Sequence, residues 1–536
     1  MSSDKLLSEM RSAASRINFK IPQQHEKDYQ IILSQSNVGI EKLMAQPDYK
    51  PIPDLKTYPR VNVCKPSSPE NPLRAWAWRA DIGEPFEAAA SGKLLAGKQV
   101  AVKDSICVAE VPLLFGTDAF DDYIPEVDAT VVTRILENGG HIAGKAVCEG
   151  FALGQSSFTS PHGPVENPCA TGFSAGGSSS GLGALIASGA IDIGIGADTT
   201  GSARIVRNVK MREKNLISQP SAVCGVVGMK PTYGLVPGTG SLSSEIIMDQ
   251  VCPMARNVVD TAVLLQVMAG SDFMDGRQIG APMPKDVPAY GQLVIDAREK
   301  GIRGCSIGVL KEGFEHSSMA PEVESMIRKA IRRFESLGAV VEEVSVPTHS
   351  LCETLEEVAC MGSHELFQGR QVGRDGLYMN DFWAQLLPWT QEKYNKAKYF
   401  VTGLALYTEY HWANHPTAYG HAMNLSRKMR DEYDAVLANF DVIVMPTVMQ
   451  PARRHVPVEA GPLAWFEASP GSTYNTTASS LTGHPSMTIP VGAVSPLSED
   501  ENIMTKQWYF ESGMPGNVRE TGGSNKAWAP SLFVVK

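Results

Sequence analysis

The chain has 536 residues, of which 43% are hydrophobic and 20% are charged. This composition is typical of a globular protein with a sizeable core, and the length allows either several domains or one large α/β unit. The formal net charge of -10 argues against nucleic acid and an anionic membrane surface as main partners, because both need a basic surface.

Cysteine usage and the N-terminal segment bear on the cellular compartment. The 9 cysteines are dispersed and contain no CxxC pair, which indicates reduced thiols in an intracellular protein rather than a disulfide framework or a zinc site. The segment 1–16 has charges but no apolar stretch of the kind found in signal peptides. No run of about 18 apolar residues would span a membrane. We therefore expect a cytoplasmic protein without a membrane span.

The sequence pattern predicts a peripheral N-terminal segment followed by alternating strands and helices. Residues 1–82 contain polar helical stretches and a proline-rich region at 51–72. The expected strands are 97–104, 141–146, 191–198, 305–310, 339–346, 441–446 and 485–491. The expected helices are 129–138, with Asp128 as its cap and Gly139 beyond its end, 183–190, 258–270 and 321–338. This alternation predicts an α/β sheet covered by helices on both faces, with a core at 83–495.

The stretch 174–181, SAGGSSSG, has the most unusual composition. On composition alone, a flexible linker explains it as well as a functional turn does. Its context argues against a linker, because an apolar helix and then a strand follow directly. A Gly/Ser turn that opens a buried helix presents N–H groups and hydroxyls at the positive end of the helix, which suits an anion or a developing oxyanion.

Three known motifs compete for this stretch. A P-loop needs a Lys after its glycines, and none is present, while a Rossmann GxGxxG has a different spacing. Gly177–Gly181 does match GxSxG, the nucleophile elbow of α/β-hydrolases, with Ser179 as its serine. That elbow needs a strand directly before it, and we do not expect one in 167–177; an HGGG-type oxyanion loop is also missing. An esterase that uses Ser179 is therefore a less favoured alternative.

Two further segments contain candidate reactive groups. The turn 196–204, GADTTGSAR, follows an expected strand, where α/β enzymes often place reactive groups; alone, it would be an ordinary strand-to-helix turn. Lys103 ends the expected strand 97–104. Such a lysine is usually an edge charge or an ion-pair partner, for example of Asp104. A lysine buried near serines is different, because desolvation lowers its pKa and makes the neutral amine available as a base.

In this order and spacing, the segments resemble the amidase signature family. The matching segments are AVKD at 101–104, GKAVCEGFALG at 144–154, NP at 167–168, GGSSSG at 176–181, GADTTGSAR at 196–204 and CGVVGMKPTYGLVP at 224–237. The resemblance is strong over 75–270 and weaker from there to about residue 492. Within the family, the chain most resembles the amidases that act on small aliphatic and aromatic carboxamides. It implies a large central mixed β-sheet covered by helices on both faces. The amidase signature domain would then span 83–495, followed by an atypical tail at 496–536.

The resemblance also implies the roles of the site residues. Ser202 corresponds to the nucleophile, and Ser178, which has a cis-peptide geometry in the family, bridges it to a neutral Lys103. This assignment agrees with the residues themselves, since a serine needs a base and none of the 11 histidines lies in these motifs. The backbone N–H groups expected to hold the oxyanion belong to Thr199, Thr200, Gly201 and Ser202. The mechanism requires neither a metal nor an organic cofactor, and HELF at 364–367 lacks the second histidine of a metalloprotease site.

Neighbouring residues are expected to have structural roles. In the family, the equivalents of Asp198 and Arg204 brace the turn that contains the nucleophile. Lys230 is expected to be a structural contact rather than a catalyst. Cys148 and Cys224 are expected to be buried core thiols.

The sequence departs from the family pattern in two places. After Ile205 the family runs directly into a Pro-Ala-x-x-Cys-Gly segment, but here Val206–Gln219 intervenes before PSAVCG. This insert is either a retained intron in the gene model, because its ends can be encoded by a GT donor and an AG acceptor in frame, or a genuine surface loop. The tail 496–536 is rich in Gly and Pro instead of forming a terminal helix. Both departures put the activity of this chain in doubt.

Other functions remain open. A glutamine-dependent amidotransferase subunit would share the catalytic residues but would need a partner protein. A catalytically impaired family member or scaffold is a further alternative, because of the insert and the tail. We expect a small-molecule amide as substrate and no nucleic acid partner, and a homodimer is left open.

Overall fold

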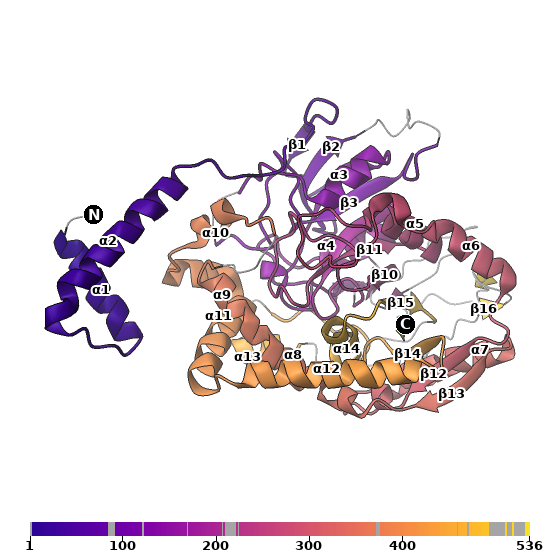
Figure 1. Cartoon of the computed structure of the whole chain (residues 1–536). Helices are drawn as coiled ribbons and strands as arrows, with labels where there is room; N and C mark the ends of the chain where they lie inside the picture. The colour runs from indigo at the N-terminus through magenta and orange to yellow at the C-terminus, as the bar shows by residue number, and fades with distance from the viewer. Residues whose placement is uncertain are drawn as a thin grey trace. The chain divides into compact units, whose positions relative to one another are not determined.

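The structure is a computed structural model of the whole chain (Figure 1). It describes residues 3–83, 92–119, 123–168, 170–205, 207–208, 221–222, 224–370, 376–457, 459–468, 471–492, 510–511, 517–518 and 531–535. These residues belong to two compact units, Met1–Pro51 and Ile52–Lys536.

The N-terminal unit is a pair of helices, α1 (Ser3–Arg16) and α2 (Glu26–Met44). Met10 and Ala14 on α1 are buried. The guanidinium of Arg11 donates two hydrogen bonds, of 2.8 and 2.9 Å, to the carboxylate of Glu26 at the start of α2. The polar helical stretches expected in this part of the chain are therefore helices that an ion pair joins.

The larger unit is built on a 12-stranded mixed sheet. In spatial order its strands are β1 (Val61–Cys64), β2 (Trp76–Ile82), β4 (His141–Ala146), β3 (Gln99–Lys103), β7 (Ile193–Asp198), β11 (Gln250–Ala255), β10 (Val227–Lys230), β15 (Ser486–Pro490), β18 (Ser531–Val535), β14 (Val442–Pro446), β12 (Ser306–Leu310) and β13 (Val340–Val344). Strand β3 is parallel to β4 and β7, and β12 is parallel to β13 and β14, while the other pairs are antiparallel. The predicted mixed sheet is confirmed.

Helices cover both faces of this sheet. They are α3 (Thr130–Glu137), α4 (Ser180–Ser188), α5 (Val258–Met268), α6 (Tyr290–Lys300), α7 (Pro321–Ser336), α8 (Cys352–Ala359), α9 (His364–Phe367), α10 (Asn380–Leu386), α11 (Gln391–Asn414), α12 (Ala418–Leu437), α13 (Pro462–Phe466) and α14 (Tyr474–Thr482). Along β3, Val100 and Val102 pack in one apolar cluster with α3 and α5, while Ala101 packs in another with α4. Because side chains alternate across a strand, the two clusters lie on opposite faces.

The late part of the sheet is covered in the same way. Val309 on β12 and Val444 on β14 pack with α7, whereas their neighbours Leu310 and Ile443 pack with α8 and α12. Figure 1 shows α12 in orange as a long helix beside the strands of this half. The predicted two-sided covering is therefore confirmed in both halves of the sheet.

Two local expectations were wrong. Asp128 does not cap α3: the N-cap is Ala129, and the Asp128 carboxylate instead pairs with Arg60 and accepts from the Ala109 N–H at 2.8 Å.

The segment 167–177 does contain a strand, β6 (Ala170–Ser174), which pairs with β5 (Glu166–Asn167). That hairpin is separate from the central sheet, so β6 is not the sheet strand that a nucleophile elbow needs.

The two departures from the family pattern lie mostly outside the described residues. Of the insert Val206–Gln219, only β8 (Arg207–Asn208) is described, and it pairs antiparallel with β9 (Ser221–Ala222). Of the tail 496–536, β18 lies between β15 and β14, and β16 (Phe510–Glu511) pairs with β17 (Asn517–Val518). The domain boundaries at residues 82 and 495 stay predictions.

Candidate active site

The site lies where two neighbouring parallel strands end. Strands β3 and β7 are in register from Val100 opposite Ile193 to Val102 opposite Ile195. Lys103 is the last residue of β3, and Asp198 is the last residue of β7. The carboxyl ends of adjacent parallel strands meet at one edge of a sheet, and α/β proteins often build their sites there.

The Gly/Ser turn enters this edge through the start of α4. The peptide bond between Gly177 and Ser178 is cis, and Ser178 is fully buried. A Cβ on Gly177 would lie 2.9 Å from Glu149 Cγ and 3.0 Å from the Gly154 carbonyl oxygen, so a larger residue would force a neighbour to move. The expected cis geometry at Ser178 is thus present in this chain.

Three side chains form one hydrogen-bonded row. Lys103 Nζ donates to Ser178 Oγ at 2.8 Å, and the Ser178 hydroxyl donates to Ser202 Oγ at 2.9 Å. Lys103 Nζ also donates to the backbone carbonyl of Ala197 at 3.3 Å. The structure therefore brings together the three residues that the sequence singled out.

Lys103 is 1% exposed, and burial lowers its pKa because the charged ammonium is poorly solvated there. In the described part of the chain no carboxylate forms an ion pair with it. The adjacent Asp104 instead pairs with Lys145 at 3.1 Å, and burial raises the pKa of Asp104. The acid next in sequence therefore does not hold the Lys103 amine in its charged form.

Ser202 lies in a tight turn after β7. Gly201 has a φ of +157°, and a Cβ there would lie 2.2 Å from Ile205 Cδ1, so only glycine fits. The Thr476 hydroxyl donates to the Thr200 carbonyl, and the Ser179 N–H donates to the Ser202 carbonyl at 3.2 Å. Within the described residues, no acceptor is found for the N–H groups of Thr199, Thr200, Gly201 and Ser202. These four donors are therefore available to a ligand oxygen.

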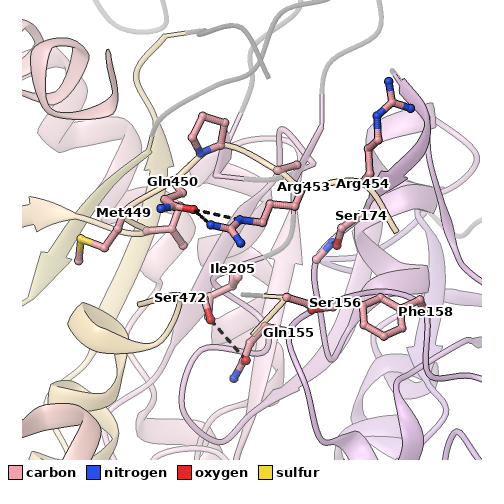
Figure 2. Close-up of a pocket in the computed structure, with 15 residues that line it drawn as sticks. Gln155, Ser156, Phe158, Ser174, Ile205, Met449, Gln450, Arg453, Arg454 and Ser472 are labelled. Carbon is pink, nitrogen blue, oxygen red and sulfur yellow. Dashed lines mark hydrogen bonds between the residues drawn. The ribbon is translucent and has the colours of Figure 1, made fainter. Parts of the chain in front are cut away.

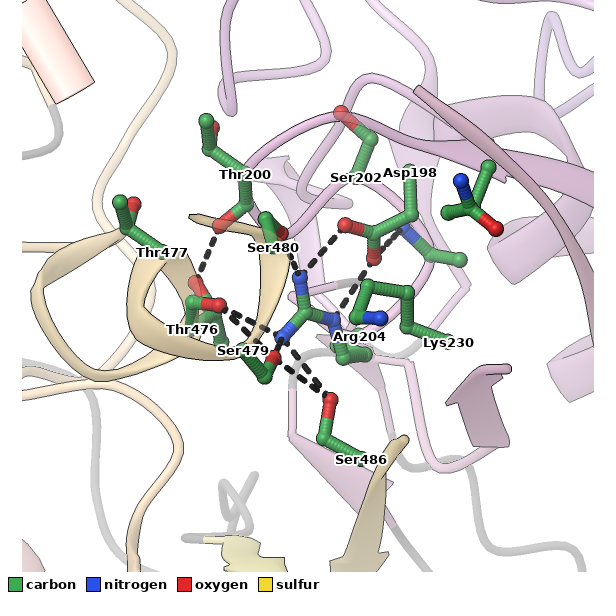
Figure 3. A network of polar contacts seen from close by, with 12 residues as sticks. Asp198, Thr200, Ser202, Arg204, Lys230, Thr476, Thr477, Ser479, Ser480 and Ser486 are labelled. Carbon is green, nitrogen blue, oxygen red and sulfur yellow. Dashed lines mark hydrogen bonds and ion pairs between the residues drawn. The ribbon is translucent and has the colours of Figure 1, made fainter. Parts of the chain in front are cut away.

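A buried ion pair fixes this turn (Figure 3). Arg204 donates to both carboxylate oxygens of Asp198, at 2.6 and 2.9 Å, and the Ala203 N–H adds a bond of 3.0 Å. The Arg204 guanidinium also donates to the Thr476 carbonyl at 2.7 Å and to Ser479 Oγ at 2.8 Å, both on α14. Burial acts to raise the pKa of Asp198, but Arg204 outweighs it and the pKa is lowered. The two residues expected as braces thus tie the turn to the late part of the chain.

Lys230 lies beside this ion pair without joining it (Figure 3). Its amine donates to the Pro231 carbonyl at 2.8 Å. Burial first, and the positive charge of Arg204 second, lower the pKa of Lys230 to about 7. Cys148 and Cys224 are fully buried, as expected for core thiols, and the Cys224 thiol donates to the Ala175 carbonyl at 3.4 Å.

The serine of the competing elbow motif has another environment. Ser179 Oγ donates to the Ala197 carbonyl at 3.2 Å, and Ser179 precedes the first residue of α4. In the portion of the chain that is described, no histidine contacts it. The structure therefore shows no base for Ser179.

Two acids that the sequence analysis missed, the buried Glu149 and the half-buried Glu356, lie near the site. Glu149 accepts from Ser180 Oγ at 2.8 Å and from Thr159 Oγ1 at 2.6 Å, and burial raises its pKa. Glu356 on α8 accepts from Thr477 Oγ1 at 2.8 Å, and burial raises its pKa although the hydroxyls of Thr473, Thr477 and Thr200 act to lower it. Glu149 lies within a matched segment, GKAVCEGFALG, and could have been found there. Glu356 has no such signal, because it is one of several acids on an amphipathic helix.

Metal sites and membrane-spanning helices can be considered for the described residues. Among them, no group of three or more His, Cys, Asp or Glu side chains is suited to hold a metal ion. No described helix has both the length and the apolar character needed to cross a bilayer.

Comparison with known proteins gives consistent matches over most of the chain. The Amidase family model matches residues 71–515. The enantioselective amidase of Rhodococcus rhodochrous is 34% identical over 452 residues, covering 82% of this chain and 81% of its own. A glutamyl-tRNA(Gln) amidotransferase subunit of Methanosarcina acetivorans is 32% identical over 418 residues, covering 77% and 81%. Amidases and amidotransferase subunits are thus both relatives.

Solved structures have the same fold. The corresponding glutamyl-tRNA(Gln) amidotransferase subunit from Thermotoga maritima has a TM-score of 0.62 and 25% identity, over 87% of this chain and 84% of that one. The peptide amidase PAM, in complex with the competitive inhibitor chymostatin, has a TM-score of 0.59 and 23% identity, over 82% and 79%. The central sheet described above is therefore the sheet of this group of proteins.

Proposed function

Since the chain belongs to the Amidase family, we propose that it hydrolyses a carboxylic acid amide to an acid and ammonia or an amine. The expected substrates are small aliphatic or aromatic carboxamides. The observation that supports this proposal best is the row Lys103–Ser178–Ser202, which ends at a turn whose N–H groups are unpaired in the described part of the chain. We further expect a cytoplasmic enzyme that uses no cofactor.

Proton transfer would begin with Lys103 in its neutral form. The neutral amine accepts the Ser178 proton while Ser178 accepts the Ser202 proton, so the two hydrogen bonds reverse direction. Ser202 Oγ then attacks the amide carbon and forms a tetrahedral intermediate. A serine hydroxyl is a weak nucleophile without such a base, and Ser–Lys arrangements serve this purpose elsewhere.

The turn after β7 would stabilise the negative charge of the intermediate. The N–H groups of residues 199–202 are the candidate donors, and loss of one such donor typically lowers the rate by about 10²–10³. Lys103, now an ammonium, returns a proton through Ser178 to the leaving nitrogen as the C–N bond breaks. Water, deprotonated by the same row, then attacks the acyl-Ser202 ester and releases the acid.

The first test measures ammonia release from acetamide, propionamide and benzamide. The full chain is compared with a version that lacks Val206–Gln219, each with a Ser202→Ala control. Activity that Ser202→Ala abolishes supports the proposal, and a fluorophosphonate probe should then label Ser202. If only the shortened version is active, the insert blocks the site and the retained-intron hypothesis gains support. If both versions fold but neither releases ammonia nor reacts with the probe, the hydrolase proposal is wrong.

An amidotransferase component is the second candidate, because glutamyl-tRNA(Gln) amidotransferase subunits match about three quarters of this chain. Such a protein would use the same row to release ammonia from glutamine for a partner. Co-purification with a partner, and glutamine hydrolysis that depends on it, would favour this candidate. A catalytically impaired family member is the remaining alternative, and a folded protein in which Ser202 does not react with the probe would favour it.

A further inference from the structure

A cavity opens beside the two turns of the site (Figure 2). One wall is Gly176, in the turn that leads to Ser178. Another is Ile205, which follows Ser202 and packs on Gly201. Because these walls adjoin the turns that hold Ser178 and Ser202, a substrate that reacts at Ser202 would place a substituent at this cavity.

Two charged residues line the cavity, Arg453 and Arg454. Figure 2 shows the Arg453 guanidinium beside Gln450 and pointing into the cavity, whereas Arg454 points away. Arg453 Nε and Nη2 both donate to Gln450 Oε1, at 3.0 and 2.5 Å, and Nη1 donates to the Glu467 carbonyl at 3.4 Å. Both acceptors are neutral, and over the described ranges no carboxylate forms an ion pair with Arg453. No Asp or Glu is among the residues that line the cavity, so no carboxylate of the lining neutralises the guanidinium.

A second polar group lies in the same cavity. The Ser472 hydroxyl donates to Gln155 Oε1 at 3.4 Å (Figure 2). This bond occupies the amide oxygen of Gln155. The described residues offer no acceptor for the NH₂ group of the same side chain. The amide of Gln155 and the guanidinium of Arg453 are thus both hydrogen-bond donors.

These donors suit one class of ligand. A carboxylate accepts two hydrogen bonds from a guanidinium, and such charge-assisted bonds are stronger than the bonds that Arg453 makes to neutral oxygens. A cation would be repelled, and an alkyl group would gain nothing from the charge. We propose that this cavity is a subsite for a carboxylate on the amide substrate and that Arg453 recognises it. The inference rests on the proposed hydrolysis at Ser202 and narrows its substrates to amides with an anionic substituent.

The test compares neutral and anionic amides of matched shape. With the carboxylate on the acyl side, 4-carbamoylbenzoate is compared with benzamide. With the carboxylate on the amine side, N-benzoylglycine is compared with N-propylbenzamide. For whichever pair fits the cavity, kcat/KM should be higher for the anionic member, and the difference should shrink at high salt because the attraction is screened. The pair that shows the effect identifies the side of the amide that enters the cavity.

Three variants separate the charge from packing. Arg453→Met should lower kcat/KM for the anionic amide by about 10- to 100-fold and leave the neutral amide unchanged, which corresponds to the loss of a hydrogen bond to a charged group. Arg453→Lys should recover part of the loss. Arg454→Met is the matched control, because it removes the other arginine of the lining, whose guanidinium stacks on the Phe173 ring, and it should leave the ratio unchanged.

The outcomes distinguish this subsite from the proposed function. If benzamide is hydrolysed but Arg453→Met affects both members of each pair equally, the proposed carboxylate subsite is wrong, while the proposed amide hydrolysis is supported. If no amide is hydrolysed, the binding of 4-carbamoylbenzoate and of N-benzoylglycine to the Ser202→Ala protein is measured by calorimetry, with and without Arg453→Met. Binding that Arg453→Met weakens supports the subsite without hydrolysis. Binding of neither ligand, or binding that Arg453→Met leaves unchanged, overturns the subsite.

Discussion

At the residue scale, the protonation state of Lys103 determines whether the row can act as a base. Its amine contacts Ser178 Oγ and the Ala197 carbonyl, and burial lowers its pKa from the ordinary value of a lysine. A neutral amine is thus reached at a lower pH than for an exposed lysine. The row is therefore suited to take up a proton under conditions in which surface lysines remain charged.

This leads to a prediction about pH. Activity requires the unprotonated amine, so kcat/KM should rise as the pH is raised through the pKa of Lys103 and level off above it. Lys103→Met should lower the rate by about 10²–10⁴, the usual contribution of a general base, and should abolish this rise. Lys103→Arg should be equally inactive, because a guanidinium stays protonated. The measurement is a pH–rate profile of each variant, over a range in which circular dichroism shows the fold to be intact. A rate that falls as the pH rises through the lower part of that range would contradict the base role.

A second residue-scale prediction concerns Glu356, which accepts from Thr477 Oγ1 at 2.8 Å and whose pKa the Thr200 hydroxyl acts to lower. Thr476, the neighbour of Thr477 on α14, donates to the Thr200 carbonyl, so Glu356 supports the part of α14 that holds the proposed oxyanion turn. Glu356→Gln keeps an acceptor and should retain most activity, whereas Glu356→Leu should lower kcat more than it raises KM. Steady-state kinetics of both variants check this. Equal behaviour of the two would indicate that Glu356 does not position the turn.

At the element scale, the Asp198–Arg204 pair joins the turn after β7 to α14. Asp198→Ala would leave the fully buried guanidinium of Arg204 without its acid, and removing one partner of a buried pair typically costs about 3–5 kcal/mol. The matched control is Glu315→Ala, which breaks an exposed pair with Lys311 worth about 0–1 kcal/mol. We expect a large downward shift of the urea midpoint for Asp198→Ala and almost none for the control. Equal shifts would show that the pair does not brace the turn.

The elements also show what the sequence could predict. Strands such as β7 and β14 were predicted because apolar runs between turn residues are typical of strands buried on both faces. The β6 strand was missed because its residues, ATGFS, include no such run, and its partner β5 is two residues long. The long helices α11 and α12 were also not predicted. Asp128 was assigned to a cap from its position in the sequence, but its ion pair with Arg60 comes from the fold.

The candidate site shows the same limit. Lys103, Ser178 and Ser202 were found because each lies in a short segment with a recognisable pattern, and their catalytic roles stay predictions. Glu356 and Arg453 come from segments without a pattern. They reach the site only through the packing of the later part of the chain, which local sequence does not reveal.

At the scale of the whole molecule, the site depends on contacts between distant parts of the chain. The turn 198–204 is held by α14 and β15, through Arg204 bonds to Ser479 and to Ser486. Strand β15 in turn pairs with β18, near the end of the chain. Because these ladders are contiguous, damage to β18 should propagate to the turn. We therefore expect β18 to contribute to the site through β15.

This dependence can be tested by the same type of substitution, Val to Asp, at one buried and one exposed position. Val535 on β18 is 1% exposed and packs in the apolar cluster that includes α8 and α12, so Val535→Asp would bury an unpaired carboxylate. Such changes belong to the most destabilising class, about 4–5 kcal/mol or more. Val61 on the edge strand β1 is 46% exposed, and Val61→Asp should cost about 0.5 kcal/mol or less.

Soluble yield, urea midpoint and fluorophosphonate labelling of Ser202 should all fall for Val535→Asp and stay near the original values for Val61→Asp. A Val535→Asp protein that is as stable as the original would show that β18 is not part of the folded sheet, and the tail would then be dispensable. A stable Val535→Asp protein that nevertheless loses labelling would instead mean that β18 acts on the turn locally, through β15 and Arg204.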